Sequence, residues 1–501
     1  MITRKEIKSY LSKEPLFDDI TCSLKATTRQ PKAMITETKK VIAMARKFSD
    51  EVLRPYALEM DRNMQQDPNY LPWDMVKKAN EWGFFTLWIP KLFGGHGYNI
   101  PSLSYFMEET GSVCLGLSNL ICVHYLAVST IFGSWNLKMI NKICRFVAEG
   151  ERTGNPCLLS TAITEPGAGT DVEEVELVDH SNVACHAKKV DGGYLINGSK
   201  IFISSGHVST WHMVICYTDL EKPSENMIIM AVKTGTKGFS FGRVEHKMGV
   251  KACPASELIF DNCFVPDDMV LCGPEDGARQ IRGSRNTNAQ ILDYVLAGSR
   301  AGVGAWGAGA ARGAYETALD FALKTEVNGK LLVNHEWAQA MLSEMYKNLS
   351  LARLAYTESN YANGLYGLFK SIQFKPVYYY LKFVPKAVFD KFASVFLDLY
   401  QTTWMFRKIQ LDWQTDEECH RTAGWGSLAK FSGTDLGMRN CQMALELMGQ
   451  SGLRHDSRAE KMLRDAKLLQ IYEGTNQLNR LNMFKCLVAR NYPQIKVFEK
   501  E

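Results

Sequence analysis

A block of short β-type segments lies between two long helical stretches, and this order constrains the fold more than any other feature. Apolar residues recur mostly at three- and four-residue spacing from Thr36 to Ala148, which predicts helices. After Pro156 the apolar runs are short and separated by Gly, Asn, Asp and Ser, which predicts a compact antiparallel sheet or barrel ending near Val265. From about Ala289 the pattern is helical again. The sequence therefore predicts an α+β fold with an N-terminal α-helical domain, a middle β-sheet domain and a C-terminal α-helical bundle.

These changes of pattern place the boundaries of the expected units. The length of 501 residues also exceeds what one simple core supports, so two or three packed units are expected. We expect an N-terminal extension (1–35), an α-helical domain (36–157), a β domain (158–274), an α-helical domain (275–490) with an insert at about 360–420, and a tail (491–501).

Composition excludes several classes of protein. The net charge is only +4 and no basic stripe or nucleic-acid-reading module occurs, so we expect no nucleic-acid partner. The 13 cysteines are scattered without a C-x-x-C pair, which argues against a disulfide framework or a metal site and favours reduced, buried thiols. The first residues lack an apolar signal core, and no stretch is expected to reach the length and purity of a membrane-spanning helix. We therefore expect a cytoplasmic location.

The segment Gly302-Val-Gly304-Ala-Trp-Gly307 matches the dinucleotide-binding pattern G-x-G-x-x-G. That motif requires a strand before it, a helix after it and βαβ alternation around it, and none of these patterns flanks the segment. The small residues instead predict a helix that packs closely against a neighbour.

Several segments carry a more specific signal in their order and spacing. They are Ser160–Asp171 (STAITEPGAGTD), Gly198–Gly206 (GSKIFISSG), Lys247–Lys251 followed by Glu257–Asp261, Ala444–Gly452 (ALELMGQSG) and Met462–Gln477, which contains Tyr-Glu-Gly-Thr. Together they resemble the acyl-CoA dehydrogenase family over about 48–490, apart from the insert.

The resemblance implies a reaction and a base. It implies an FAD-dependent acyl-CoA dehydrogenase that converts an acyl-CoA thioester to the 2-enoyl-CoA and passes electrons to an electron-transfer flavoprotein. Glu473 is the implied base, and its backbone N–H, with a flavin hydroxyl, would hold the thioester carbonyl. Gly474 lets the backbone come close at a crowded turn. Ser299 stands where some family members carry an alternative carboxylate base, which supports Glu473.

The resemblance also assigns contacts with cofactor and substrate. Substrate contacts fall on Thr170, Arg300 and Gly474. Contacts with FAD fall on Ile163, Thr164, Thr170, Phe202, Ser204, His335, Gly449, Thr475 and Gln477.

The chain departs from the family where the flavin diphosphate would bind across a subunit contact. Thr325 replaces an arginine, Asn328 a phenylalanine, and Glu336 and Glu446 each a glutamine. Because a cation is lost and acids are gained, contact with a diphosphate should weaken. Either another group compensates or flavin binding is altered. Ala297 also replaces the aspartate that usually precedes the CoA-contacting arginine.

The insert has an unusual composition. Residues 365–400 hold eleven aromatic residues and five lysines, with only two acids. Three roles remain open for it: contact with a membrane surface, docking of an electron-accepting protein, or packing against another subunit.

Other functions remain open beside the dehydrogenase. They are an acyl-CoA oxidase, an enoyl-CoA reductase on the same fold, and a non-catalytic relative that binds CoA or a protein partner. The resemblance further implies a homodimer or homotetramer.

Overall fold

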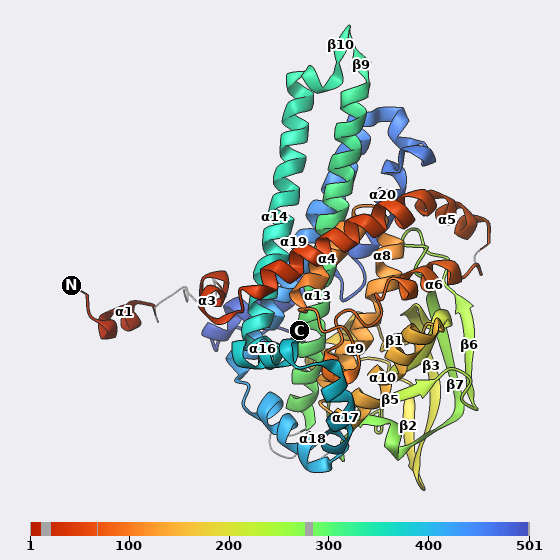
Figure 1. The fold of residues 1–501 in the computed structure, drawn as a ribbon, viewed down its shortest axis with the longest axis vertical. Coiled ribbons are helices and arrows are strands. Elements are labelled where there is room, and N and C mark those ends of the chain that lie inside the picture. The colour runs from red at the N-terminus through yellow and green to blue at the C-terminus, as the bar shows by residue number, and fades with distance from the viewer. Residues whose placement is uncertain (1, 12–21, 68, 276–283, 499–501) are drawn as a thin grey trace.

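The computed structural model describes residues 2–11, 22–67, 69–275 and 284–498. Along the chain, a helical domain comes first, a sheet domain follows, and a second helical domain ends the described part (Figure 1). The first helices are α1 (Arg4–Leu11) and α3 (Cys22–Arg29). The N-terminal domain that follows contains α4 (Ala33–Phe48), α5 (Arg54–Gln66), α6 (Trp73–Glu81), α7 (Pro101–Gly111), α8 (Leu115–Cys122), α9 (His124–Gly133) and α10 (Leu137–Thr153).

Local signals in the sequence explain the bounds of the last of these helices. The Asn136 side chain caps α10 by accepting a hydrogen bond from the Met139 N–H at 3.2 Å. Gly154 ends the helix with a φ of 74°, a left-handed conformation that costs glycine little.

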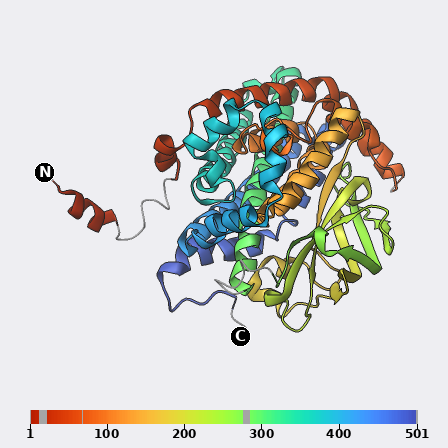
Figure 2. The same cartoon turned by 60° about the horizontal axis from the view of Figure 1, so that its bottom comes forward.

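The middle domain is one mixed sheet in the strand order β6-β7-β3-β2-β4-β5-β8, with β1 paired to β4. Most neighbouring pairs are antiparallel, as predicted, but β1 and β2 each pair with β4 in parallel. The sheet domain lies against one flank of the helices in both views (Figures 1 and 2). Its strands are β1 (Leu158–Ala162), β2 (His186–Val190), β3 (Gly193–Ser204), β4 (Ser209–Tyr217), β5 (Met227–Lys233), β6 (Phe239–Val244), β7 (Ala255–Pro266) and β8 (Val270–Cys272).

Three long helices form the body of the C-terminal domain: α13 (Ser284–Lys324), α14 (Glu336–Tyr366) and α19 (Asp416–Met448). The hairpin of β9 (Glu326–Val327) and β10 (Lys330–Leu331) joins α13 to α14 at the far tip of the molecule (Figure 1). The G-x-G-x-x-G segment lies inside α13, so the prediction of a closely packed helix is confirmed. A Cβ atom on Gly307 would lie 2.3 Å from the Gly433 carbonyl carbon of α19.

The insert forms four short helices between α14 and α19: α15 (Lys370–Gln373), α16 (Lys375–Phe383), α17 (Lys386–Leu397) and α18 (Tyr400–Arg407). It packs on the N-terminal domain of its own chain. The Arg145 guanidinium pairs with Asp390 at 2.7 Å, and Arg407 donates to the Ser134 carbonyl at 2.9 Å. Several aromatic side chains of the insert remain exposed, namely Phe374, Tyr380, Phe383, Phe396 and Tyr400.

The expectation that no stretch reaches the length and apolar purity of a membrane-spanning helix is wrong for Leu115–Gly133, which passes by length and composition. This stretch is α8 and α9, and 83% of it is buried inside the protein. Buried core helices pass the same test, and these two pack beneath the sheet domain, where β1 contacts α9.

Candidate active site

A cavity of about 600 Å³ lies where all three domains meet, and its walls are mostly apolar. Seven of the residues assigned by resemblance line it: Ile163, Thr164, Thr170, Phe202, Ser204, Glu473 and Gly474. The cavity does not include His335, Gly449, Thr475 or Gln477 among its lining residues, nor Arg300.

Glu473 lies in the loop between α20 (Ala459–Leu469) and α21 (Asn476–Met483). Two buried side chains donate hydrogen bonds to the backbone carbonyls of this loop. Lys430 Nζ donates to the Gly474 carbonyl at 2.7 Å, and Asn479 Nδ2 donates to the carbonyls of Glu473 and Gly474 at 3.2 and 3.0 Å. The loop therefore presents Glu473 on a fixed backbone.

The carboxylate of Glu473 has the properties of a base. Its Oε2 atom is buried and has no hydrogen-bond partner among the residues that the structure describes. Burial raises its pKa, while the Ser299 hydroxyl and the charges of Arg300 and Lys430 oppose that shift. An acceptor oxygen free of partners, in a carboxylate of raised pKa, suits proton abstraction.

A second carboxylate, Glu173, lines the same cavity, and the sequence interpretation missed it. Its Oε2 atom lies 3.1 Å from Arg300 Nη2. Burial raises the Glu173 pKa to about 7, and the Glu473 charge contributes to that shift. The available signal was the run Asp171-Val-Glu173-Glu174, which places acids directly after a motif that resembles a flavin-contacting segment.

Arg300 forms ion pairs with carboxylates beside the cavity. Its side chain is fully buried, and it pairs with Glu173 and, at 3.8 Å, with Glu174. The predicted contact of Arg300 with substrate stays a prediction.

The two segments expected to contact the flavin are joined by a buried ion pair. Lys200 Nζ lies 2.6 Å from Glu165 Oε1 and also donates to the Ile163 carbonyl at 2.9 Å. The Ile201 N–H donates to the Thr164 carbonyl at 2.9 Å. These bonds hold β3 against the loop after β1 and fix one wall of the cavity.

This wall fits a planar aromatic group such as the flavin ring. Phe202 has a φ of 58° and is 54% exposed, although its neighbours Ile201 and Ile203 are buried. Gly298 and Gly169 line the same cavity, and a Cβ atom on either would meet nothing within 4 Å. An exposed ring and open space in one cavity are what a stacked cofactor requires.

Comparison with known proteins places this geometry in a family. Models of acyl-CoA dehydrogenase domains match in order along the chain: the N-terminal domain at 36–144, the middle domain at 160–263, and the C-terminal domain at 289–362 and 390–487. The chain belongs to the acyl-CoA dehydrogenase family. It is thus a flavoprotein oxidoreductase acting on CH–CH groups, which confirms the predicted fold, enzyme class and FAD dependence.

Individual relatives agree with this assignment. A short-chain specific acyl-CoA dehydrogenase of Clostridium acetobutylicum is 26% identical over 89% of this chain and 96% of its own length. Cyclohex-1-ene-1-carbonyl-CoA dehydrogenase of Syntrophus aciditrophicus is 28% identical, covering 89% of this chain and 88% of its own. The solved butyryl-CoA dehydrogenase from Megasphaera elsdenii shares the fold at a TM-score of 0.68, with 21% identity over 90% of this chain and 98% of that one.

In this dehydrogenase three of the positions that depart from the family pattern do not line the cavity that contains Glu473. Thr325 and Asn328 lie at the hairpin at the tip of α13 and α14, and Glu336 begins α14 (Figure 1). His335 belongs to the same turn, where its Nε2 atom lies 3.0 Å from the Val327 carbonyl oxygen. Five of the assigned cofactor residues therefore line the cavity, whereas His335 lies at the tip.

Two further assigned residues of the dehydrogenase have local roles. The Thr475 hydroxyl accepts from the Leu478 N–H at 3.2 Å and caps α21. Gly449 ends α19 with a φ of 54°. Both roles explain the residue type without a ligand, and their contact with FAD stays a prediction.

Proposed function

We propose that this enzyme removes hydrogen from carbons 2 and 3 of an acyl-CoA thioester, giving the 2-enoyl-CoA, with Glu473 as the base. One observation carries the proposal: the partner-free Oε2 atom of Glu473 belongs to a residue that lines the same cavity as Thr164 and Phe202. A base and a platform for an aromatic cofactor therefore share one apolar space.

Glu473 is suited to take the proton from carbon 2. Its raised pKa brings it closer to working pH, where a carboxylate accepts a proton more readily than an ordinary surface glutamate does. The apolar walls, including Leu103, Met107 and Trp306, exclude water from the reacting atoms.

The backbone of Glu473 is suited to hold the thioester carbonyl. The structure describes no hydrogen-bond acceptor for its backbone N–H, although its carbonyl is bonded by Asn479. A fixed N–H donor at this point would stabilise the negative charge that develops on the thioester oxygen as the proton leaves.

Ile163, Thr164, Phe202 and Ser204 would hold the flavin ring against β3. When bound, FAD supplies the acceptor for the hydride that leaves carbon 3. We further propose that electrons then pass to an electron-transfer flavoprotein, as the resemblance implies. A homo-oligomeric state, a cytoplasmic location and contact of the insert with a membrane remain predictions.

Replacing Glu473 by Gln tests the proposal, because it keeps the size of the side chain and removes the base. We expect the purified, FAD-loaded enzyme to lose its flavin absorbance when a suitable acyl-CoA is added without oxygen. Glu473→Gln should slow this bleaching by roughly 10²–10⁴-fold. The matched control is Glu149→Gln, an exposed residue of α10 that pairs with Arg152, three positions later in the same helix.

Undiminished bleaching in Glu473→Gln would exclude Glu473 as the base. Turnover with oxygen as the sole acceptor would identify an oxidase, and turnover only from the enoyl-CoA with a reductant would identify a reductase. No bleaching by any member of an acyl-CoA panel would favour the non-catalytic alternative.

A further inference from the structure

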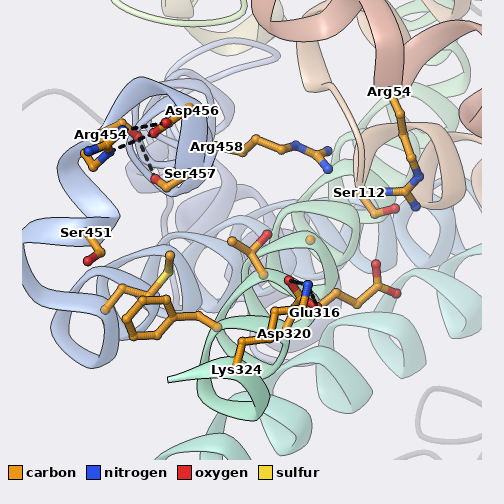
Figure 3. Close-up of a pocket in the computed structure, with 14 residues that line it drawn as sticks. Arg54, Ser112, Glu316, Asp320, Lys324, Ser451, Arg454, Asp456, Ser457 and Arg458 are labelled. Carbon is orange, nitrogen blue, oxygen red and sulfur yellow. Dashed lines mark hydrogen bonds and ion pairs between the residues drawn. The ribbon is translucent and has the colours of Figure 1, made fainter. Parts of the chain in front are cut away.

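The cavity shown in Figure 3, of about 720 Å³, has charged walls in which cations already have partners. Arg454 pairs with Asp456 at 2.8 Å, and Arg54 pairs with Asp50 at 2.9 Å. The catalytic cavity differs, because one part of its wall carries uncharged polar side chains whose hydrogen bonds are incomplete. The proposed reaction assigns no role to these side chains.

This polar part of the catalytic cavity is formed by three amide side chains from α14 and α15, here called the amide cluster. Asn360 and Asn363 are three positions apart on α14, so they share one face of that helix. Gln373 ends α15, lines the same cavity and is only 4% exposed. A Cβ atom on Gly364 would lie 2.4 Å from Gln373 Oε1, which places Gln373 against α14 beside Asn363.

Two amides of the cluster each have one polar atom without a partner in the described part of the chain. Asn363 Nδ2 donates to the Ala297 carbonyl at 3.3 Å, and the structure describes no donor for Asn363 Oδ1. Gln373 Oε1 accepts from Gln30 Nε2 at 3.4 Å, and the structure describes no acceptor for Gln373 Nε2. The cluster therefore offers one free acceptor and one free donor. A bound group that completes both hydrogen bonds would remove the cost of unpaired buried polar atoms.

The wall around the amide cluster is uncharged. Asn360 Oδ1 accepts from the Ser104 hydroxyl of α7 at 3.2 Å, which adds a neutral polar pair. Lys370, at the start of α15, pairs with Glu418 at 3.2 Å and does not line the cavity. Every Asp, Glu, Lys, Arg or His that lines the cavity comes from elements other than α7, α14 and α15, namely Glu173, Glu245, His246, Lys247, Lys467 and Glu473. A carboxylate on a ligand would therefore find no lining cation on these three helices.

Part of this wall lies outside the matched family domains. The C-terminal domain model matches 289–362 and 390–487, and Asn363, Leu368, Phe369 and Gln373 all lie between these stretches. Leu368 and Phe369 line the cavity with apolar surface between the amides of α14 and that of α15 in the sequence. The first part of the insert therefore shapes the catalytic cavity.

We propose that the amide cluster selects an acyl group that carries a neutral hydroxyl at the end remote from the thioester. A hydroxyl group both donates and accepts, so it can pair with Asn363 Oδ1 and Gln373 Nε2 together. Apolar lining residues, including Leu103 and Met107, would hold the methylene chain. A terminal carboxylate would lack a cation and would meet the Asn363 acceptor, so it should bind poorly. This substrate class rests on the reaction proposed above, in which Glu473 acts at carbon 2.

The test compares pairs of thioesters of equal chain length, from butanoyl to hexadecanoyl, that differ only in a terminal hydroxyl. Their 2-enoyl-CoA forms are titrated calorimetrically into the oxidised, FAD-loaded enzyme, which measures affinity without turnover. At one chain length, we expect the hydroxylated form to bind roughly 10–100-fold more tightly than the plain form, because it completes two buried hydrogen bonds.

The variant Gln373→Met keeps the length of the side chain and removes the donor. It should weaken binding of the hydroxylated form by roughly 10-fold and strengthen binding of the plain form. Opposite changes for the two ligands distinguish selection from a general loss of structure. The matched control is Gln339→Met, because Gln339 is an exposed glutamine of α14 that does not line the cavity. This control should keep the wild-type ratio of affinities.

Equal affinity of both forms at every chain length, or no binding of either form, would overturn the proposal. Tighter binding of a form with a terminal carboxylate would also overturn it. So would a parallel loss of both affinities in Gln373→Met, which would assign Gln373 a purely structural role. Flavin reduction by acyl-CoA without oxygen reports separately on the proposed reaction, because product affinities can be measured even if no reduction occurs.

Discussion

Two glycines of α13 differ sharply in what surrounds them, and alanine at each should change stability in opposite directions. A Cβ atom on Gly307 would lie 2.3 Å from the carbonyl carbon and 2.4 Å from the oxygen of Gly433. These are backbone atoms of α19, so a rotamer change cannot relieve the contact. A Cβ atom on Gly298 would meet nothing within 4 Å.

The expected magnitudes follow from two opposing effects. Alanine is favoured over glycine in a helix interior by about 1 kcal/mol, which applies at both positions. Overpacking a core costs about 1–3 kcal/mol, and a clash with backbone places Gly307→Ala at the upper end. We therefore expect Gly307→Ala to destabilise the protein by roughly 2 kcal/mol and Gly298→Ala to stabilise it by about 1 kcal/mol.

Thermal unfolding of the flavin-free protein, followed by circular dichroism at one scan rate, measures the difference, because Gly298 lines the cavity that would hold the flavin. For a cooperative unit of 150–250 residues, 1 kcal/mol shifts Tm by about 2–4 °C, so the two variants should differ by roughly 6–12 °C. A Gly307→Ala variant with a Tm at or above wild type would refute the close contact of α13 with α19. An equal fall in Gly298→Ala would show that the loss of glycine, rather than the contact, is responsible.

Two further predictions concern the catalytic cavity. Lys200→Met leaves the buried Glu165 carboxylate without its cation and should lower the free energy of unfolding by about 3–5 kcal/mol. The loss should be seen as a lower Tm and as loss of bound flavin. A wild-type Tm would contradict the role of this pair. Glu173→Gln removes a negative charge beside Glu473 and releases Arg300 toward it, and both changes lower the Glu473 pKa. Because the base acts as the carboxylate, the rate of flavin reduction rises with pH through that pKa, so its rising limb should move to lower pH. The control is Glu176→Gln, because Glu176 pairs with Lys485 at 3.1 Å and does not line the cavity. A limb that stays in place, or that moves equally in this control, would contradict the coupling.

The sequence was sufficient for the features that depend on local pattern. The switch from helical to β-type spacing near Pro156 predicted the middle domain, because burial of one face imposes a period on each element. The Tyr-Glu-Gly-Thr segment led to Glu473, and the two segments around Thr164 and Ser204 led to another part of the same cavity wall. Each of these signals is a run of neighbouring residues.

The features that the sequence did not predict are contacts between distant segments. Glu173 and Arg300 are 127 positions apart, and their pairing depends on how the loop after β1 meets α13. The same packing buries Arg300, which the resemblance had assigned to the substrate. Charge pairs of this kind depend on tertiary structure and produce no periodic pattern in the sequence.

The conformation of the base loop shows how such distant contacts support the local motif. Glu473 and Gly474 have φ values of 55° and 74°, so two consecutive residues are left-handed. Glycine adopts this conformation at little cost, whereas a residue with a Cβ atom pays about 1–2 kcal/mol. Lys430 and Asn479 hold the carbonyls that follow, and a side chain on Gly474 would approach Glu173 Oε2 to 2.8 Å. The strained backbone at Glu473 is therefore held by buried donors on α19 and α21, and it keeps Glu473 in the wall of the cavity.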